Sequence, residues 1–175
     1  MTPTSLAQHK AKHLLSHVLV AAGARRWPEV VLGESGETPT GFYADFGLAR
    51  PPSDEELAAV TDEMARLLAN GQCVRSLTLA PPAARTLFAR QPWKAQQVEV
   101  LAECQEAVNC FEMDGFYDLC DCILTQPREL LAVHPETFTL THVSLVAWVH
   151  RGKEHWFHRV FGELFPAPVP CGCCR

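Results

Sequence analysis

The second half of the chain restricts the fold most, because it reads as a series of extended strands. From about residue 96 onward, five stretches predict β-structure: VEVLAE, AVNCFEM, GFYDLC, TFTLTHVSLVAWVHR and HWFHRVFGELF. The stretch TQPRELLAVHPE interrupts them as a loop or short helix. Strands that follow one another directly, without a helix between each pair, predict an antiparallel sheet.

The first half contains the clearest helix, in the stretch ARPPSDEELAAVTDEMARLLANGQ. Ser53 stands at the N-cap and Glu56 follows three residues later, which is the pattern of a capping box. Asn70 and Gly71 are typical of a helix end. The apolar stripe between them is formed by Leu57, Val60, Met64, Leu67 and Leu68.

The remaining elements complete an α+β order. Residues 5–22 predict a helix, residues 30–32 a short strand, GESGETPTG a turn and GFYADFGL a strand. CVRSLTL predicts a further strand and PPAARTLFAR a short helix. We therefore expect an antiparallel β-sheet with helices packed on one face. One domain is expected over residues 1–167, followed by a flexible Cys-rich tail at 168–175.

Composition and charge narrow the classes of partner. The chain has 175 residues, 47% of them apolar and 20% charged, as in a globular protein. Its net charge of −5 requires that any RNA partner be held by a local basic patch, and we expect no DNA partner. No apolar run approaches the ~20 residues of a membrane span, and the histidine-bearing N-terminus is no secretory signal. The sequence predicts a cytoplasmic protein without a membrane partner.

The eight cysteines are interpreted as reduced thiols, some buried and some metal-binding, because no signal peptide accompanies them. The terminal CGCCR follows the proline-rich FPAPVP. It is interpreted as a soft metal site, a lipidated end or an irregular terminus.

Three histidines at four-residue intervals stand in HKAKHLLSH, within the first predicted helix. Residues i and i+4 project from one helix face, so His9 and His13 could hold one metal ion. A zinc protease needs glutamate directly after the first histidine, and Lys10 excludes it. The three rings flank the apolar arc of the helix, which suits the wall of a cleft. His17 lies a turn further on and is interpreted as a packing residue or a supporting hydrogen-bond partner.

A second polar group stands in GFYDLCDC, which contains Asp118, Cys120 and Cys122. The C-x-C spacing is too short for a zinc knuckle, although strand alternation can place both thiols on one face. Alternatively, Asp118 and Cys120 form a polar cluster at a strand end that lines a cleft.

Taken in order, the motifs HxxxHLLxH, GFYxDF, WK, FYDLC and HRVFGELF resemble the editing domain of threonyl-tRNA synthetases. That family shows HSxxHLLxxA, GFYYDF, a lysine after an aromatic residue, VDLCRGPH and LQRIYGTAF in the same order. The resemblance covers about residues 8–165 and implies the threonyl/alanyl-tRNA synthetase editing-domain fold. Since the chain ends at Arg175, it implies a freestanding relative or an excised piece rather than a synthetase.

The resemblance also implies an activity: removal of a mischarged small amino acid, serine or alanine, from the acceptor end of tRNA. It carries catalytic roles to His9, His13, Lys94, Asp118 and Cys120. His9 or His13 would activate a water, Lys94 would hold the terminal adenosine or developing negative charge, and Asp118 would bind the substrate's ammonium group.

One departure from the family opens an alternative. The family's last histidine is replaced by Leu124, so the pocket has either lost catalysis or found another ligand. Related alanyl-tRNA editing proteins bind zinc, and here His9, His13 and Cys120, with Cys122 or His134, are the predicted Zn²⁺ ligands. A catalytically degenerate module that binds tRNA, an amino acid or a metal is the alternative to a working deacylase.

Overall fold

The computed structural model describes residues 3–69, 74–104, 107–120, 137–150 and 152–165. Its helices are α1 (Pro3–Arg26), α2 (Asp54–Ala69), α3 (Pro81–Phe88) and α4 (Pro92–Cys104). Its strands are β1 (Val31–Glu37), β2 (Gly41–Gly47), β3 (Arg75–Leu79), β4 (Val108–Met113), β5 (Phe116–Leu119), β6 (Phe138–His150) and β7 (Lys153–Leu164). None of these described helices is long and apolar enough to cross a membrane.

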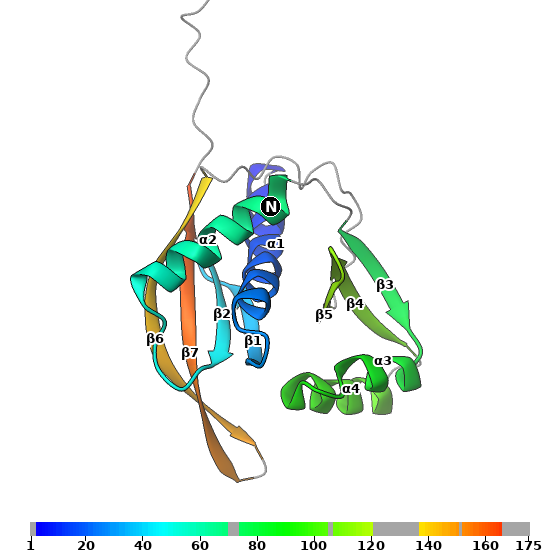
Figure 1. The fold of residues 1–175 in the computed structure, drawn as a ribbon. Helices are drawn as coiled ribbons and strands as arrows, with labels where there is room; N and C mark the ends of the chain where they lie inside the picture. Colours follow the sequence, from blue (N-terminus) through cyan, green and yellow to red (C-terminus); the bar gives the residue numbers. More distant parts are fainter. Residues whose placement is uncertain (1–2, 70–73, 105–106, 121–136, 151, 166–175) are drawn as a thin grey trace, which may run out of the picture.

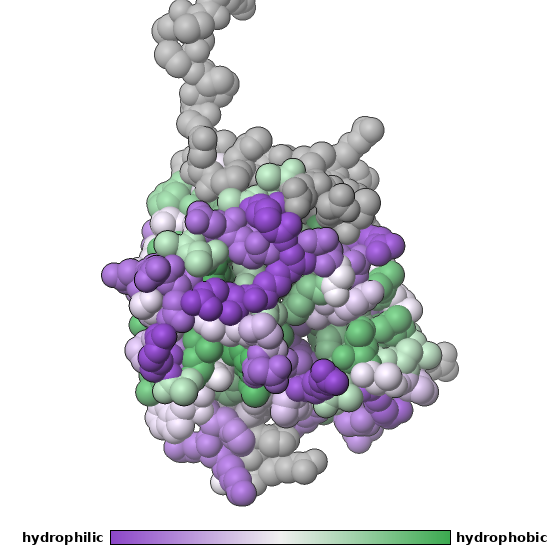
Figure 2. Space-filling model, in the orientation of Figure 1, coloured by the Kyte–Doolittle hydropathy of each residue, from purple (hydrophilic) through white to green (hydrophobic). Residues whose placement is uncertain are grey.

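Two antiparallel sheets divide the strands (Figure 1). One contains β1-β2-β7-β6 in that order and the other contains β3-β4-β5. The α+β prediction is confirmed. α2 crosses the four-stranded sheet, and α1 runs between the two sheets. The outer face of α2 is mainly hydrophilic, as Figure 2 shows, because its apolar stripe is turned inward.

The first core lies between α1, α2 and the four-stranded sheet, and buried residues of β4 also belong to it. Phe42, Ala44 and Phe46 alternate along β2, so all three point to the face that α1 covers. α1 passes so close that a Cβ added at Gly23 would collide with the Phe46 ring. The helix is therefore fixed against β2 along the turns that follow its histidines.

The second core lies between the three-stranded sheet and the pair α3 and α4. It is formed by Ala84, Phe88, Val98, Val108 and Cys110. The β4–β5 hairpin turns at Asp114 and Gly115, both with positive φ (49° and 79°), which is the geometry that Asp-Gly favours in a two-residue hairpin.

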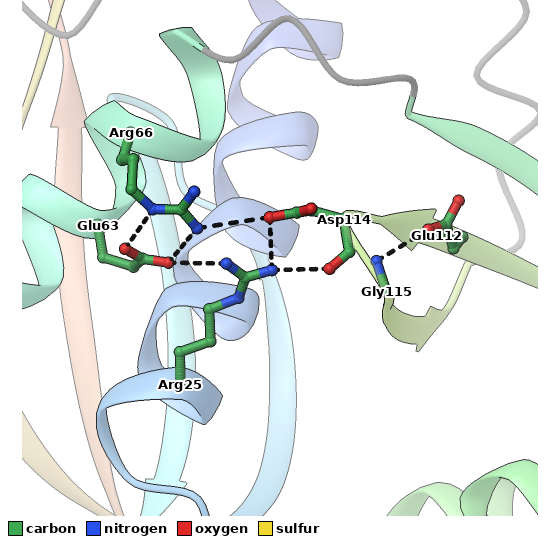
Figure 3. Close-up of polar contacts among 6 residues, drawn as sticks. All are labelled: Arg25, Glu63, Arg66, Glu112, Asp114 and Gly115. Atoms are coloured by element: carbon green, nitrogen blue, oxygen red, sulfur yellow. Dashed lines mark hydrogen bonds and ion pairs between the residues drawn. The ribbon is translucent and has the colours of Figure 1, made fainter.

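Polar contacts fasten the two parts together. Arg25 at the end of α1 donates hydrogen bonds to the carbonyl and the carboxylate of Asp114, at 2.7 and 2.8 Å, and pairs with Glu63 of α2 at 3.0 Å (Figure 3). Arg66 joins the same group of carboxylates. These guanidinium groups are thus already engaged with carboxylates, so the network links α1, α2 and the β4–β5 hairpin.

The side-chain amide of Gln91 makes a second connection. It accepts a hydrogen bond from Leu32 N (2.8 Å) and donates one to Val30 O (3.0 Å), as a neighbouring strand would do. Because Gln91 directly precedes α4, this pairing fixes the start of α4 against β1. Lys94 lies in the first turn of that helix.

Two local predictions from sequence were wrong. VEVLAE is helical, as part of α4, because Pro92 begins a helix that continues through it. Val98 is consequently buried while Val100 is 56% exposed, whereas a strand would place both on one face. The polar GESGE, predicted as a turn, belongs to β1 and pairs with β2 around a bulge between Leu32 and Ser35. The capping box of Ser53 and Glu56 is confirmed by reciprocal hydrogen bonds of 2.9 and 3.3 Å.

Candidate active site

Two histidines of α1 and one cysteine form a compact cluster where α1 meets the end of β5. His13 Nε2 lies 3.2 Å from Cys120 Sγ and 3.2 Å from His17 Nε2. One ligand atom from each of these three residues lies within 4.8 Å of the other two. The helix repeat explains the pairing, because residues four apart share a face. His17 also stacks on Phe111 of β4, with ring centroids 4.7 Å apart.

A buried carboxylate supports this cluster from the three-stranded sheet. Asp118 is only 1% exposed. It accepts a hydrogen bond from His17 Nδ1 (3.0 Å) and forms an ion pair with Lys94 Nζ (2.8 Å). Burial alone would raise the pKa of Asp118, yet the charges of Lys94 and His17 hold it well below its usual value. Asp118 is therefore a fixed anion.

Glu37, the last residue of β1, supports the cluster from the opposite side. Its carboxylate lies 3.4 Å from His13 Nδ1 and 2.6 Å from His9 Nδ1. The Glu37 side chain is 17% exposed and that of His9 is 58% exposed. His9 is thus connected to the cluster through Glu37.

The contacts of the two rings indicate where their protons lie. A carboxylate only accepts, so the contacts with Glu37 and Asp118 favour hydrogen on the Nδ1 atoms of His13 and His17. Their Nε2 atoms then face each other at 3.2 Å with lone pairs, and Cys120 has one S–H to offer. A proton or a metal ion bound at this point would lie within reach of both rings.

The pKa directions agree with extra proton binding. The hydrogen bond with Cys120 raises the pKa of His13, against partial burial, and the charge of Glu37 adds to the rise. Burial would lower the pKa of His17, but its hydrogen bonds with Asp118 and Cys120 bring the value above the ordinary one. The cluster thus stabilises positive charge in a partly buried position.

The structure brings together four of the five residues proposed as catalytic from sequence: His13, Lys94, Asp118 and Cys120. The fifth, His9, lies outside the group of possible metal ligands, and His17 occupies that place. The supporting hydrogen bond predicted for His17 is present, but the ring also faces His13 directly. Cys122, Leu124 and His134 lie outside the described residues.

The motif GFYADF forms most of β2 and supports the four-stranded sheet. A Cβ at Gly41 would collide with the carbonyl oxygen of Gly162, so only glycine allows β2 and β7 to approach. The buried carboxylate of Asp45 accepts hydrogen bonds from Arg159 (2.7 and 2.8 Å) and Trp148 (2.9 Å). Arg159 is thus paired with a carboxylate inside the sheet.

Comparisons with known proteins give one consistent relationship. No family model matches the chain. The chain is 29% identical over 160 residues to a threonine–tRNA ligase of Clostridium perfringens. The matched segment covers 91% of this chain and 24% of that protein. The chain is 27% identical over 154 residues to that of Dehalococcoides mccartyi (88% and 25%) and 26% identical over 162 residues to that of Synechococcus sp. (91% and 26%).

The chain spans about a quarter of the length of the curated relatives that it matches. The chain is therefore related to a segment of threonine–tRNA ligase of about 160 residues.

Proposed function

We propose that this protein is an aminoacyl-tRNA deacylase of the editing type, acting in the cytoplasm. Its substrate would be the ester that joins a mischarged serine or alanine to the acceptor end of tRNA. The observation that carries the proposal is the cluster of His13, His17 and Cys120, backed by the buried Lys94–Asp118 pair. The relationship to a segment of threonine–tRNA ligase supports the proposal, because that enzyme acts on threonine and tRNA.

His13 is the residue best suited to activate water. Its side chain is 27% exposed, whereas that of His17 is 4% exposed and reaches solvent less. In the proposed reaction, His13 Nε2 accepts a proton as the water oxygen attacks the ester carbonyl carbon. Collapse of the tetrahedral intermediate breaks the ester bond, and the departing ribose oxygen recovers the proton. The products are the free amino acid and deacylated tRNA.

His17 would support this transfer. The hydrogen bond to Asp118 orients the His17 ring and holds its Nε2 3.2 Å from His13 Nε2. Both oxygens of Asp118 are already engaged by His17, Lys94 and its neighbour's backbone N–H. We therefore assign Asp118 to holding His17 and Lys94, rather than to binding the substrate's ammonium group.

A deacylation assay tests the proposal. The protein is incubated with seryl-, alanyl- and threonyl-tRNA, and loss of the ester is followed. Hydrolysis of seryl- or alanyl-tRNA above background is expected. His13→Ala should lower the rate by about 10²- to 10⁴-fold. His142→Ala, on the outer strand β6, is the matched control and should leave it unchanged. Absence of hydrolysis with all three tRNAs would refute the proposal.

A metal-binding function is the second candidate, favoured by the donor set itself. His13, His17 and Cys120 offer two imidazole nitrogens and one sulfur, which are the ligand types of zinc. Each ring has its other nitrogen on a carboxylate, Glu37 or Asp118, as metal-bound histidines do. A zinc ion held there would lower the pKa of a bound water.

Elemental analysis of the purified protein separates the two candidates. Stoichiometric zinc that is lost in His17→Ala and Cys120→Ser, but retained in His9→Ala, would support a site of these three ligands. This differs from the His9, His13, Cys120 and Cys122 set predicted from sequence. Protein that neither contains zinc nor takes it up would exclude the metal function. Zinc binding without hydrolysis would indicate a binding module.

A further inference from the structure

Glu37 contacts the site but has no role in the reaction proposed above. It ends β1 and receives two rings from successive turns of α1, at 2.6 Å from His9 Nδ1 and 3.4 Å from His13 Nδ1. The next residues are tied to the same helix, because Lys12 Nζ donates hydrogen bonds to the carbonyls of Thr38 (2.9 Å) and Pro39 (3.1 Å). The end of β1 is thus fixed against the first half of α1.

The chemistry of imidazole gives this contact a consequence. A neutral ring carries hydrogen on one nitrogen only, and the hydrogen bond at one nitrogen decides which. The Glu37 carboxylate, 3.4 Å from His13 Nδ1, favours hydrogen on that nitrogen and a lone pair on Nε2, which lies beside Cys120. Asp118 does the same for His17 from the opposite side. The two carboxylates, on different sheets, thus orient two rings toward one point.

We propose that Glu37 is a positioning residue that fixes the Nδ1–H tautomer and the ring orientation of His13. His9 then acts through Glu37 by holding its second oxygen, and does not touch the substrate. The inference rests on the proposed function for its kinetic consequence, but the tautomer itself is a property of the resting protein. It assigns to His9 an outer place in the site, consistent with its high exposure.

The tautomer is tested by long-range ¹H–¹⁵N NMR of the histidine rings in chelator-treated protein, so that no ion holds Nε2. In the wild type, His13 should show a protonated Nδ1 and an unprotonated Nε2. Glu37→Ala should shift the population toward the Nε2–H form. Glu37→Gln keeps an oxygen acceptor of the same shape and should preserve the wild-type pattern. An unchanged tautomer in Glu37→Ala would overturn the inference.

Kinetics give the second readout. Glu37→Ala should lower kcat by about 10- to 100-fold, with KM little changed, as expected when a partner that orients a catalytic ring is lost. Glu37→Gln should recover part of that loss, and His9→Ala should reduce kcat less than Glu37→Ala. Glu29→Gln, at an exposed position after α1, is the matched control. Equal kcat in Glu37→Ala and the wild type would also overturn the inference.

The two failures are distinguishable. If no charged tRNA is hydrolysed, the proposed function fails while the NMR result still decides the role of Glu37. If hydrolysis occurs and depends on His13 but not on Glu37, the function stands and the positioning role fails.

Discussion

The buried pair of Lys94 and Asp118 predicts a large energetic coupling. The ammonium and carboxylate lie 2.8 Å apart, and their side chains are only 5% and 1% exposed. With an effective dielectric constant of about 20, Coulomb's law gives an attraction of about 6 kcal/mol at this separation. Desolvation offsets part of it, so the net value of the intact pair is smaller than the effect of breaking it.

Lys94→Met removes the cation and leaves the Asp118 carboxylate buried. Breaking such a pair on one side lowers the free energy of unfolding by about 3–5 kcal/mol. Asp118→Asn in the same protein removes the stranded charge and still accepts a hydrogen bond from His17. The double variant should therefore be more stable than Lys94→Met alone, although two side chains have been changed.

The assay is urea unfolding of the wild type, both single variants and the double variant at pH 7. The lowered pKa of Asp118 means that its contribution is complete above its ordinary pKa of about 3.9 and is lost only as pH falls through the folded value. A matched cycle on the exposed Arg85–Glu99 pair should show coupling near the detection limit. Additive effects at Lys94 and Asp118, within about 0.5 kcal/mol, would refute the reasoning.

The raised pKa values of His13 and His17 stabilise the fold fully below the ordinary value of about 6.5, and this contribution disappears as pH rises through the folded values. The unfolding free energy of the wild type, relative to a His13→Gln/His17→Gln variant, should thus fall as pH rises above about 6.5 in urea titrations, and a constant difference would contradict this. The ion pairs of Arg25 predict that Arg25→Ala accelerates amide exchange in the β4–β5 hairpin. Arg85→Ala, which breaks a pair between α3 and α4, should leave that exchange unchanged, and equal effects of both variants would argue against the network. Gly41→Ala should lower Tm by at least several degrees or prevent folding, because the new Cβ meets a backbone carbonyl of β7; an unchanged Tm would show that the strands can separate at no cost.

Local signals in the sequence predicted those parts of the fold that local energetics determine. The capping box at Ser53 and Glu56 satisfies hydrogen bonds within four residues, so it is readable without knowing the rest of the structure. GESGE has the composition of a turn, yet it extends β1 because pairing with β2 outweighs that preference. Gly33 fits this arrangement, since a Cβ there would collide with Asp45.

The candidate site, too, was predictable only where local sequence motifs indicated its residues. The motifs indicated His13, Lys94, Asp118 and Cys120, and the structure places them together. Glu37 was not found, because it lies in the stretch interpreted as a turn. The spacing of the three histidines was visible, but which two converge depends on where β5 meets α1. That meeting point is set by contacts between segments a hundred residues apart.

The position of the site between the two cores has a thermodynamic consequence. His13 and His17 belong to the helix of the first core, while Lys94 and Asp118 belong to elements that form the second. A ligand that needs all four residues binds only when the two parts are docked. By mass action it must then stabilise that docking by an amount that grows with its concentration. Protection of the β4–β5 hairpin against exchange would thus serve as a binding assay for substrate analogues, even for those that are never hydrolysed.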